Sequence, residues 1–404
     1  MQQFFEVQEN LLNDLEKNNL IENKRYLYWK IDFTEKLIWI VWARWVGKTT
    51  MLLQYIYNLK KSFESLYISA DNIYFLENDL FEFIRNFYNK YDWKLIVIDE
   101  VHKIKNWSQI LKNAYDSFPN LQIIFSWSSS LDLKIWNFDL SRRTSLYYLE
   151  WFSFREYLNF NYKSNIEKID FSKIIENYLD FSISFSKNIP ILKYFDEYLK
   201  FWYYPYLEKK NSKSYEKVVE TIDKTIYEDI SSFYNLKSNN LLLLKKIINY
   251  LAINPPWEIN INKISKTLEI DNKTTNHYLE ILEKVWIVKF LLKDVYGYNI
   301  LKNTNKIYLN NSVLYYSINS FLNKEINIWT IREIFLINQV SSSNNKIAFS
   351  KIWDFKIGEY IFEVWWANKT FSQIKDVENS YLVLDDILIS WKNKIPLWLF
   401  WFMY

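Results

Sequence analysis

The stretch that decides the fold is "LIWIVWARWVGKTTMLLQYI", residues 37–56. Residues 36–41 form a short run of mostly apolar, β-branched side chains, which predicts a buried parallel strand. From Lys48 onward the apolar residues recur at helical spacing, which predicts a helix. A strand, a tight loop and a helix in this order are the context in which the pattern G-x-x-x-x-G-K-[ST] binds phosphate groups.

This pattern falls on residues 42–49, and only its first glycine is missing, because Trp42 takes that place. Backbone N–H groups of the loop would wrap a β-phosphate, Lys48 would reach the β- and γ-phosphate oxygens, and the Thr49 hydroxyl would hold Mg²⁺. We expect Trp42 to distort the loop by about 1–3 kcal/mol, because a Cβ obstructs the backbone angles that glycine supplies. The expected nucleotide-binding residues are Trp42, Ala43, Arg44, Trp45, Val46, Gly47, Lys48, Thr49 and Thr50.

Two further strand-like runs end in polar residues that suit phosphate chemistry. The run "KLIVI" ends in Asp99 and Glu100, and we expect its strand to lie beside the loop strand. Asp99 would be the acid on the metal side, and Glu100 the base that polarises the attacking water. The run "LQIIFSWSSS" places Ser126, or alternatively Ser128, where a residue that senses the γ-phosphate is expected. A serine-rich turn without such a role is the plainer alternative.

Arg142 and Arg143 follow in "FDLSRRTSLYYL". One of them could neutralise charge in the transition state as an arginine finger, in cis or from a neighbouring subunit. A solvated pair of arginines is the alternative interpretation.

The order of the motifs "GKTT", "LIVIDEVHKIKNWSQILKNAYDSFP", "IIFSWSSSLDL" and "DLSRRTSLYYLEWFSFREYL" resembles the prokaryotic AAA-type ATPases that carry a C-terminal DUF4143 region. These are similar to archaeal-type ATPases of the STAND-like group. The resemblance runs from about residue 25 to the C-terminus. It implies a P-loop ATPase core that uses ATP and Mg²⁺.

The chain has 3 Gly and 19 Trp, whereas about 7% Gly, or roughly 28 residues, is usual. Trp286 follows a predicted helix where a glycine belongs, and Trp257 follows two prolines. Our hypothesis is that most of these tryptophans are glycines, because some bacterial lineages read the codon UGA as glycine, whereas a common alternative translation table reads it as tryptophan. The rival reading is a genuine Trp42 in a degenerate, non-hydrolysing scaffold. The family has tryptophan at Trp107 and Trp398, but glycine at Trp42, Trp127, Trp151, Trp365, Trp366 and Trp401.

Residues 236–295 predict a winged helix-turn-helix: a helix ending near Ile253, helices over 261–269 and 272–285 with Asn272 as the cap, and a strand over 287–294. A protein-contact or lid-like element is one use of such a module, and DNA binding is the alternative. The presumed recognition helix would expose Lys273, Thr274, Asn276 and His277.

The last hundred residues resemble the PD-(D/E)xK nuclease core in the order of four residues. These are Glu333, Asp354, Glu363 and Lys369. Residue 365 is Trp where the catalytic lysine belongs, so Lys369 would have to substitute from a shifted position. Two of the carboxylates could still hold Mg²⁺. A nuclease-like fold with a structural use is the plainer interpretation.

The predicted fold class is α/β. Its parts are an N-terminal helix (1–25), a P-loop parallel-sheet ATPase core (26–152), a helical lid or connector (153–235), a winged helix (236–295) and a small α+β nuclease-like domain (296–404).

The absence of cysteine excludes disulfides and thiolate zinc sites. A net charge of +3 does not by itself argue for nucleic acid. No signal peptide or sufficiently long apolar run is present, so we expect a cytoplasmic protein without a membrane partner.

The predicted function is Mg-dependent ATP hydrolysis whose nucleotide state controls the C-terminal half. An ATP-regulated DNA-binding or nuclease protein is the alternative. A protein partner or self-association is compatible with both.

Overall fold

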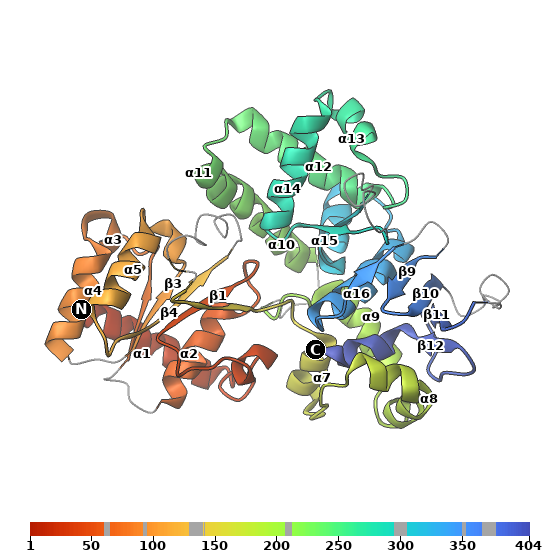
Figure 1. Cartoon of the computed structure of the whole chain (residues 1–404), viewed down its shortest axis with the longest axis horizontal. Coiled ribbons are helices and arrows are strands. Elements are labelled where there is room, and N and C mark those ends of the chain that lie inside the picture. The colour runs from red at the N-terminus through yellow and green to blue at the C-terminus, as the bar shows by residue number, and fades with distance from the viewer. Residues whose placement is uncertain are drawn as a thin grey trace. The chain divides into compact units, whose positions relative to one another are not determined.

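The computed structural model describes residues 1–59, 65–91, 95–128, 140, 142–206, 212–294, 305–349, 353–365 and 377–404. The chain divides into two compact units, residues 1–151 (unit 1) and residues 152–404 (unit 2). Figure 1 shows the helices and strands of both units. None of the described helices is both long and apolar enough to cross a bilayer.

Unit 1 is built on a parallel sheet with the strand order β2-β3-β4-β1-β5. β1 and β3 are buried at every position, as their continuous apolar sequences predict for strands covered on both faces. β4 lies between β1 and β3, so the prediction that the strand ending in Asp99 lies beside the loop strand is wrong. The strands are β1 (Leu37–Val41), β2 (Ser65–Ser69), β3 (Leu95–Asp99), β4 (Gln122–Trp127) and β5 (Ser145–Tyr148).

Alternate residues of β1 serve the two faces of this sheet. Leu37, Trp39 and Val41 join a core with side chains of α4 and α5, whereas Ile38 and Ile40 are buried on the opposite face. The helices are α1 (Gln2–Lys17), α2 (Lys48–Asn58), α3 (Tyr74–Glu77), α4 (Leu80–Tyr91) and α5 (Trp107–Ser117), with 3-10 turns η1 (Tyr26–Trp29) and η2 (Val101–Lys103).

Helix α1 covers β2, which is an edge strand of the sheet. The Gln8 side chain donates to the carbonyl oxygen of Ser65 (3.3 Å) and accepts from the backbone N–H of Tyr67 (2.6 Å). A single buried amide thus makes two of the hydrogen bonds that a neighbouring strand would make.

Unit 2 begins with a group of helices. Ser153 and Glu156 form a reciprocal capping box at the start of α7, which fixes where that helix begins. A π-helical segment, η3, continues α10 into α11. The elements are α7 (Phe154–Tyr162), α8 (Phe171–Asn188), α9 (Ile191–Phe201), α10 (Ser212–Lys224), η3 (Thr225–Ile230) and α11 (Ser231–Tyr234).

Three helices and an antiparallel strand pair follow in the order predicted from the sequence: α12 (Ser238–Ile253), α13 (Ile261–Leu268), α14 (Asn272–Lys284), then β6 (Val288–Leu291) paired with β7 (Lys306–Leu309). The predicted cap is wrong by one residue. The Asp271 side chain, not that of Asn272, accepts from the backbone N–H of Thr274 (2.9 Å).

The last part of unit 2 packs helices on a mixed sheet with the order β12-β11-β10-β9-β8. β9 and β10 form the predicted hairpin, with Gly358 in the left-handed region (φ 61°) at its turn. β10, β11 and β12 run parallel. The elements are α15 (Ser312–Leu322), α16 (Ile328–Ser342), β8 (Ile347–Ala348), β9 (Phe355–Ile357), β10 (Tyr360–Trp365), β11 (Ser380–Leu384), β12 (Lys394–Pro396) and η6 (Leu397–Met403).

Candidate functional site

The loop between β1 and α2 has the geometry expected of a phosphate-binding turn. Gly47 adopts a left-handed conformation (φ 96°) immediately before α2, a conformation that favours glycine. The Lys48 ammonium is buried and donates to the carbonyl oxygens of Trp42 (2.9 Å) and Ala43 (2.7 Å). The lysine therefore folds back over the loop and holds its beginning against the helix.

Trp42 does not behave as the sequence predicts. It has no positive φ, and its ring is buried, edge-on to Tyr148 and Trp151 with centroids 6.2 Å away in each case. The left-handed non-glycine residue of this loop is Trp45, with φ 66°. The expected backbone strain thus lies at Trp45, since a bulky side chain is a rare occupant of that conformation.

Of the other suspected tryptophans, three are buried, one has a left-handed backbone, and Trp257 and Trp365 are exposed and have no positive φ. Trp127, Trp151 and Trp401 are buried rings, and Trp401 stacks on Phe154 at 3.6 Å. Trp286 ends α14 with φ 63°, the backbone that the sequence predicts for a glycine there. Trp366 lies outside the described residues. Among the suspected tryptophans that the structure describes, Trp286 is thus the one whose left-handed backbone agrees with the hypothesis that the residue is a glycine.

Asp99, at the end of β3, is the centre of a hydrogen-bond network. Its Oδ2 accepts from the Thr49 hydroxyl (2.5 Å) and from the Tyr67 hydroxyl (3.0 Å). Its Oδ1 accepts from the Ser126 hydroxyl and from the backbone N–H of Glu100 (3.1 Å). The acid predicted to face the metal is thus in direct contact with the hydroxyl predicted to bind it.

Ser126 in β4 and Ser128, one residue beyond its end, each contact one of the two acids. Ser126 donates to Asp99, whereas Ser128 donates to Glu100 Oε2 at 3.1 Å. Residues two apart on a strand share a face, so the spacing of the serines matches the edge formed by the acids. Ser126, predicted to sense the γ-phosphate, is engaged with Asp99, and its alternative Ser128 is engaged with Glu100.

Glu100 itself has a left-handed backbone (φ 53°), which is uncommon for a non-glycine residue. His102 Nδ1 lies 3.4 Å from Glu100 Oε2, and the imidazole is stacked on Trp127 with ring centroids 5.3 Å apart. Ser128 and His102 thus approach the same carboxylate oxygen and fix the direction of the Glu100 side chain.

Tyr67 is a site residue that sequence reasoning missed. It lies on β2, is buried, and donates to Asp99. Burial, and after it the charge of Asp99, raise the pKa of Tyr67 far above its usual value. The phenol therefore stays protonated and remains a donor to Asp99 at any physiological pH.

Arg25 was missed as well. It is 4% exposed and donates to the carbonyl oxygen of Val46 in the loop, as well as to those of Glu150 (2.8 Å) and Trp151 (3.1 Å). These partners lie 21 to 126 residues away in sequence, so no local pattern could have indicated them.

Arg142 and Arg143 lie at the opposite edge of the sheet. They precede β5, which runs parallel to β1, and therefore belong with the amino ends of the strands, whereas the phosphate loop follows the carboxyl end of β1. Arg143 pairs with Asp116 through its Nε (3.1 Å) and Nη2 (3.2 Å). An arginine finger acting in cis is excluded by this placement. Action from a neighbouring subunit stays a prediction.

Three of the four nuclease-like residues lie in the described part of unit 2, and two of them are hydrogen-bonded to protein groups. Glu333 accepts from Tyr308 (2.8 Å) and lies 3.4 Å from Lys306 Nζ, while Asp354 accepts from the backbone N–H of Val364 (3.1 Å). Glu363 is buried, and Lys369 lies outside the described residues. Among the described side chains no group of three or more acids or histidines is placed to hold a metal ion.

The presumed recognition helix, α14, offers few unengaged polar groups. The Thr274 hydroxyl donates to Asp271 (2.6 Å), and the Asn276 amide donates to Glu280 (2.7 Å). His277 lies edge-on to Tyr234, with ring centroids 5.9 Å apart. Two of the four side chains predicted to face DNA are therefore bound to acids of the same segment.

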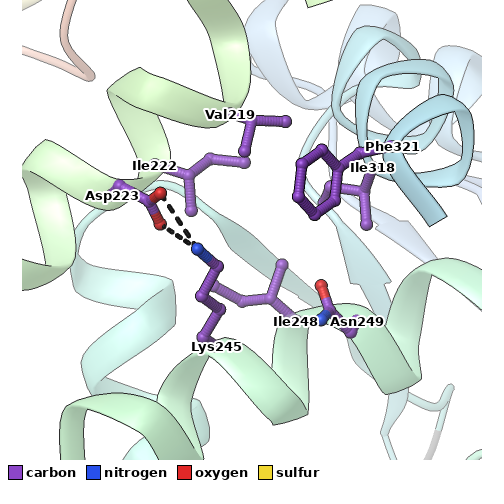
Figure 2. Close-up of a pocket in the computed structure, with 8 residues that line it drawn as sticks. All are labelled: Val219, Ile222, Asp223, Lys245, Ile248, Asn249, Ile318 and Phe321. Carbon is purple, nitrogen blue, oxygen red and sulfur yellow. Dashed lines mark hydrogen bonds and ion pairs between the residues drawn. The ribbon is translucent and has the colours of Figure 1, made fainter. Parts of the chain in front are cut away.

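A hollow in unit 2 lies between α10, α12 and α15 (Figure 2). Asp223 and Lys245 form an ion pair in it, with Nζ 2.7 Å from Oδ1, and the other lining residues are mostly apolar. Its cavity volume of about 10 Å³ has room for one water molecule at most. It is too small for a nucleotide.

Comparison with known families agrees with the geometry of unit 1. Residues 34–158 match the AAA domain family AAA_14. These residues are therefore similar to an AAA-type P-loop domain. Residues 192–325 match a domain of unknown function, DUF8612. The resemblance of the sequence implies a different family for the C-terminal region, DUF4143.

Uncharacterized proteins from an archaeon and a bacterium are among those similar over most of the chain. MJ1637 of Methanocaldococcus jannaschii is 29% identical over 308 residues, which cover 69% of this chain and 64% of the relative. A protein of Haemophilus influenzae is 24% identical over 316 residues, covering 72% and 71%. The chain thus spans just under two thirds of the M. jannaschii relative.

Solved structures give distant likenesses. The Walker-type ATPase PABY2304 of Pyrococcus abyssi has a TM-score of 0.40 at 14% identity, covering 70% of this chain and 91% of that chain. AMPPCP-bound DnaA from Aquifex aeolicus has a TM-score of 0.27 at 16% identity, covering 65% and 86%. Neither likeness is close enough to carry a functional argument.

Proposed function

We propose that unit 1 binds ATP with Mg²⁺ and hydrolyses it. The observation that carries this proposal is the 2.5 Å contact between the Thr49 hydroxyl and Asp99 Oδ2. It joins the first turn of the helix after the phosphate loop to the end of β3. Mg²⁺ prefers oxygen ligands and commonly takes one or two from the protein, the rest coming from phosphates and water. The donor set of Thr49 and Asp99 fits that preference.

The remaining residues have roles that their contacts support. The backbone N–H groups of residues 43–49 and the start of α2 would receive the phosphates. Lys48 would exchange the carbonyl oxygens of Trp42 and Ala43 for phosphate oxygens, an exchange that needs only a rotation of its side chain. Glu100, directed by Ser128 and His102, would accept a proton from the attacking water. When bound, Mg²⁺ would neutralise charge on the phosphates.

The test uses the full chain and two variants. Isothermal titration with ATP and Mg²⁺ should show saturable binding by the wild type, which Lys48→Ala abolishes. Phosphate release should be measurable for the wild type and should fall roughly 100- to 10,000-fold in Glu100→Gln, which keeps the shape of the side chain and removes its basicity. Wild-type protein that shows no saturable binding would leave the scaffold alternative, in which Trp42 is genuine and the loop no longer functions.

The tryptophan hypothesis is tested by the codons of the gene. If UGA encodes residues 42, 127, 286 and 365 while UGG encodes residues 107 and 398, the four residues encoded by UGA are glycines. Proteins for assay must then carry glycine at the UGA positions. UGG at all six positions would reject the hypothesis.

We further propose that the nucleotide state of unit 1 controls unit 2. A winged-helix role of α12–α14 with β6 and β7 is supported by the order of these elements. DNA binding through α14 is the specific alternative. It requires salt-sensitive binding of duplex DNA that Lys273→Glu abolishes. An absence of binding at low salt rejects it. Nuclease activity stays a prediction, and among the described residues no group of three or more acids or histidines adds support to it.

A further inference from the structure

Arg25 joins two segments that meet at the proposed nucleotide site. Its guanidinium donates through Nη1 to the Val46 carbonyl oxygen of the phosphate loop. Through Nη2 it donates to the carbonyl oxygens of Glu150 and Trp151. Burying a guanidinium is costly unless its donors are satisfied, so a buried arginine with three carbonyl partners is a specific arrangement.

The bond to Val46 fixes a peptide plane. No peptide bond of the described chain is cis, and in a trans peptide the carbonyl oxygen and the following N–H point in opposite directions. A guanidinium that holds the Val46 oxygen therefore turns the Gly47 N–H away from Arg25. Gly47 is the residue whose left-handed backbone opens α2, and its N–H is one of the donors of a phosphate loop.

Tyr26, the neighbour of Arg25, and Trp42 of the loop make further contacts with the segment that contains Glu150 and Trp151. The Tyr26 hydroxyl donates to the Tyr148 carbonyl oxygen (3.0 Å) and accepts from the Glu150 N–H (3.1 Å). The Trp42 ring packs edge-on against Trp151. Residues 148–151 are the last of unit 1 and lead along the chain into unit 2.

We propose that Arg25 is a positioning residue of the phosphate loop: it presents the Gly47 N–H to the phosphates and ties the loop to the segment that leads into unit 2. This inference rests on the proposed nucleotide binding and names a residue on which that binding depends. It also gives a route by which phosphate at the loop restrains residues 148–151.

The first experiment compares full-length wild type, Arg25→Met, Arg25→Lys and Lys24→Met by titration with pyrophosphate and with ATP. In Arg25→Met a donor to the charged ligand is no longer well oriented. The affinities for pyrophosphate and for ATP should therefore fall by the same factor, roughly 10- to 100-fold. Arg25→Lys, which keeps a cation and some of the donors, should lie between. Lys24 stands beside Arg25 over the rings of Tyr28 and Trp29, so Lys24→Met is a matched control for charge alone and should bind as the wild type does.

The second experiment measures hydrogen exchange at the amides of residues 148–151. Pyrophosphate should slow exchange there in the wild type and in Lys24→Met, but not in Arg25→Met at a concentration that saturates it. A variant that is only less stable would lose affinity without losing this response. Thermal unfolding of each variant checks that it is folded.

The outcomes separate this inference from the function on which it rests. If the wild type binds neither pyrophosphate nor ATP, the proposed function fails. If the wild type binds and Arg25→Met binds equally well, or keeps the exchange response, the role of Arg25 is wrong while the proposed function stands. Should Arg25→Met not fold, Arg25→Lys decides, and wild-type affinity in that variant overturns the inference.

Discussion

Asp99 in unit 1 and Glu333 in unit 2 are both buried carboxylates that accept a hydrogen bond from a strand tyrosine, Tyr67 at 3.0 Å and Tyr308 at 2.8 Å. Their other partners differ. Asp99 accepts from two further hydroxyls and a peptide N–H, and in the part of the chain that the structure describes no cationic side chain pairs with it. Glu333 faces the Lys306 ammonium at 3.4 Å.

This difference shows which of the two acids is suited to an ionic ligand. Hydroxyl and amide donors orient a carboxylate and leave its net charge in place, whereas an ammonium neutralises it. Asp99 also lies beside a loop of backbone N–H groups and a lysine, whereas Glu333 lies within helix α16. The comparison supports the ligand-binding role proposed for Asp99 and favours a structural role for Glu333.

The largest effect is expected when the charge of Asp99 is removed. Asp99→Asn keeps the size of the side chain and removes its charge. Mg-dependent ATP hydrolysis should then fall roughly 100- to 1,000-fold, since a fixed charge at the metal is lost. Glu333→Gln should hydrolyse ATP at the wild-type rate. Phosphate release at saturating ATP measures both, and equal rates for the two variants would contradict the assignment.

The next effect concerns the tyrosine partner of Asp99. Tyr67→Phe removes one hydroxyl and leaves the ring, so the Mg²⁺ concentration for half-maximal activity should rise roughly 10- to 100-fold, as is typical when a residue that orients a metal ligand is lost. Tyr57→Phe is the matched control, because Tyr57 lies in the same unit and bonds Glu16 on its surface. An unchanged Mg²⁺ dependence in Tyr67→Phe would remove Tyr67 from the site.

A smaller effect tests the structural role of Glu333. Burial, as the largest cause, raises the pKa of Glu333 above its usual value, against the opposing influence of Lys306. Between the ordinary pKa and the raised one, the folded state binds more protons than the unfolded state. The free energy of unfolding therefore falls as pH rises through that window.

Glu333→Gln should remove this part of the pH dependence, which urea unfolding can measure from about pH 4, near the ordinary pKa of glutamate, up to about pH 8. The same fall with pH in the variant would show that another group causes it.

The smallest effect concerns the backbone of unit 2. Trp286→Gly should raise the free energy of unfolding by about 1–2 kcal/mol, because glycine adopts φ 63° without strain. Trp257, which is half-exposed and has no positive φ, is the control. Trp257→Gly should be neutral or destabilising. Destabilisation by both substitutions would argue that Trp286 contributes more by packing than it loses by strain.

The sequence predicts local features of this fold well and distant ones poorly. The helix at Lys48, the strand that ends in Asp99 and the hairpin at Gly358 follow from apolar periodicity and turn chemistry, which act over a few residues. The order of the sheet does not, so β4 was not expected between the strands of the loop and of Asp99.

The candidate site divides in the same way. Lys48, Thr49 and the paired acids belong to contiguous motifs and were predicted. Tyr67 contacts a residue 32 positions away in the sequence, and Arg25 contacts residues up to 126 positions away. Only the folded chain brings these residues together. The sequence predicts strain at Trp42, whereas Trp45 has the left-handed backbone, because the motif indicates a tight turn but not which of its residues adopts that conformation.

The bonds that Gln8 makes with β2 have a practical consequence for handling the protein. An open strand edge is a template on which another chain can add, and this is a common start of aggregation. Gln8 occupies that template at Ser65 and Tyr67. A shortened protein that begins just before the phosphate loop would keep the motif and lose this protection. We expect such a fragment to self-associate through β2, and to do so with Tyr67, the partner of Asp99, in the strand that pairs.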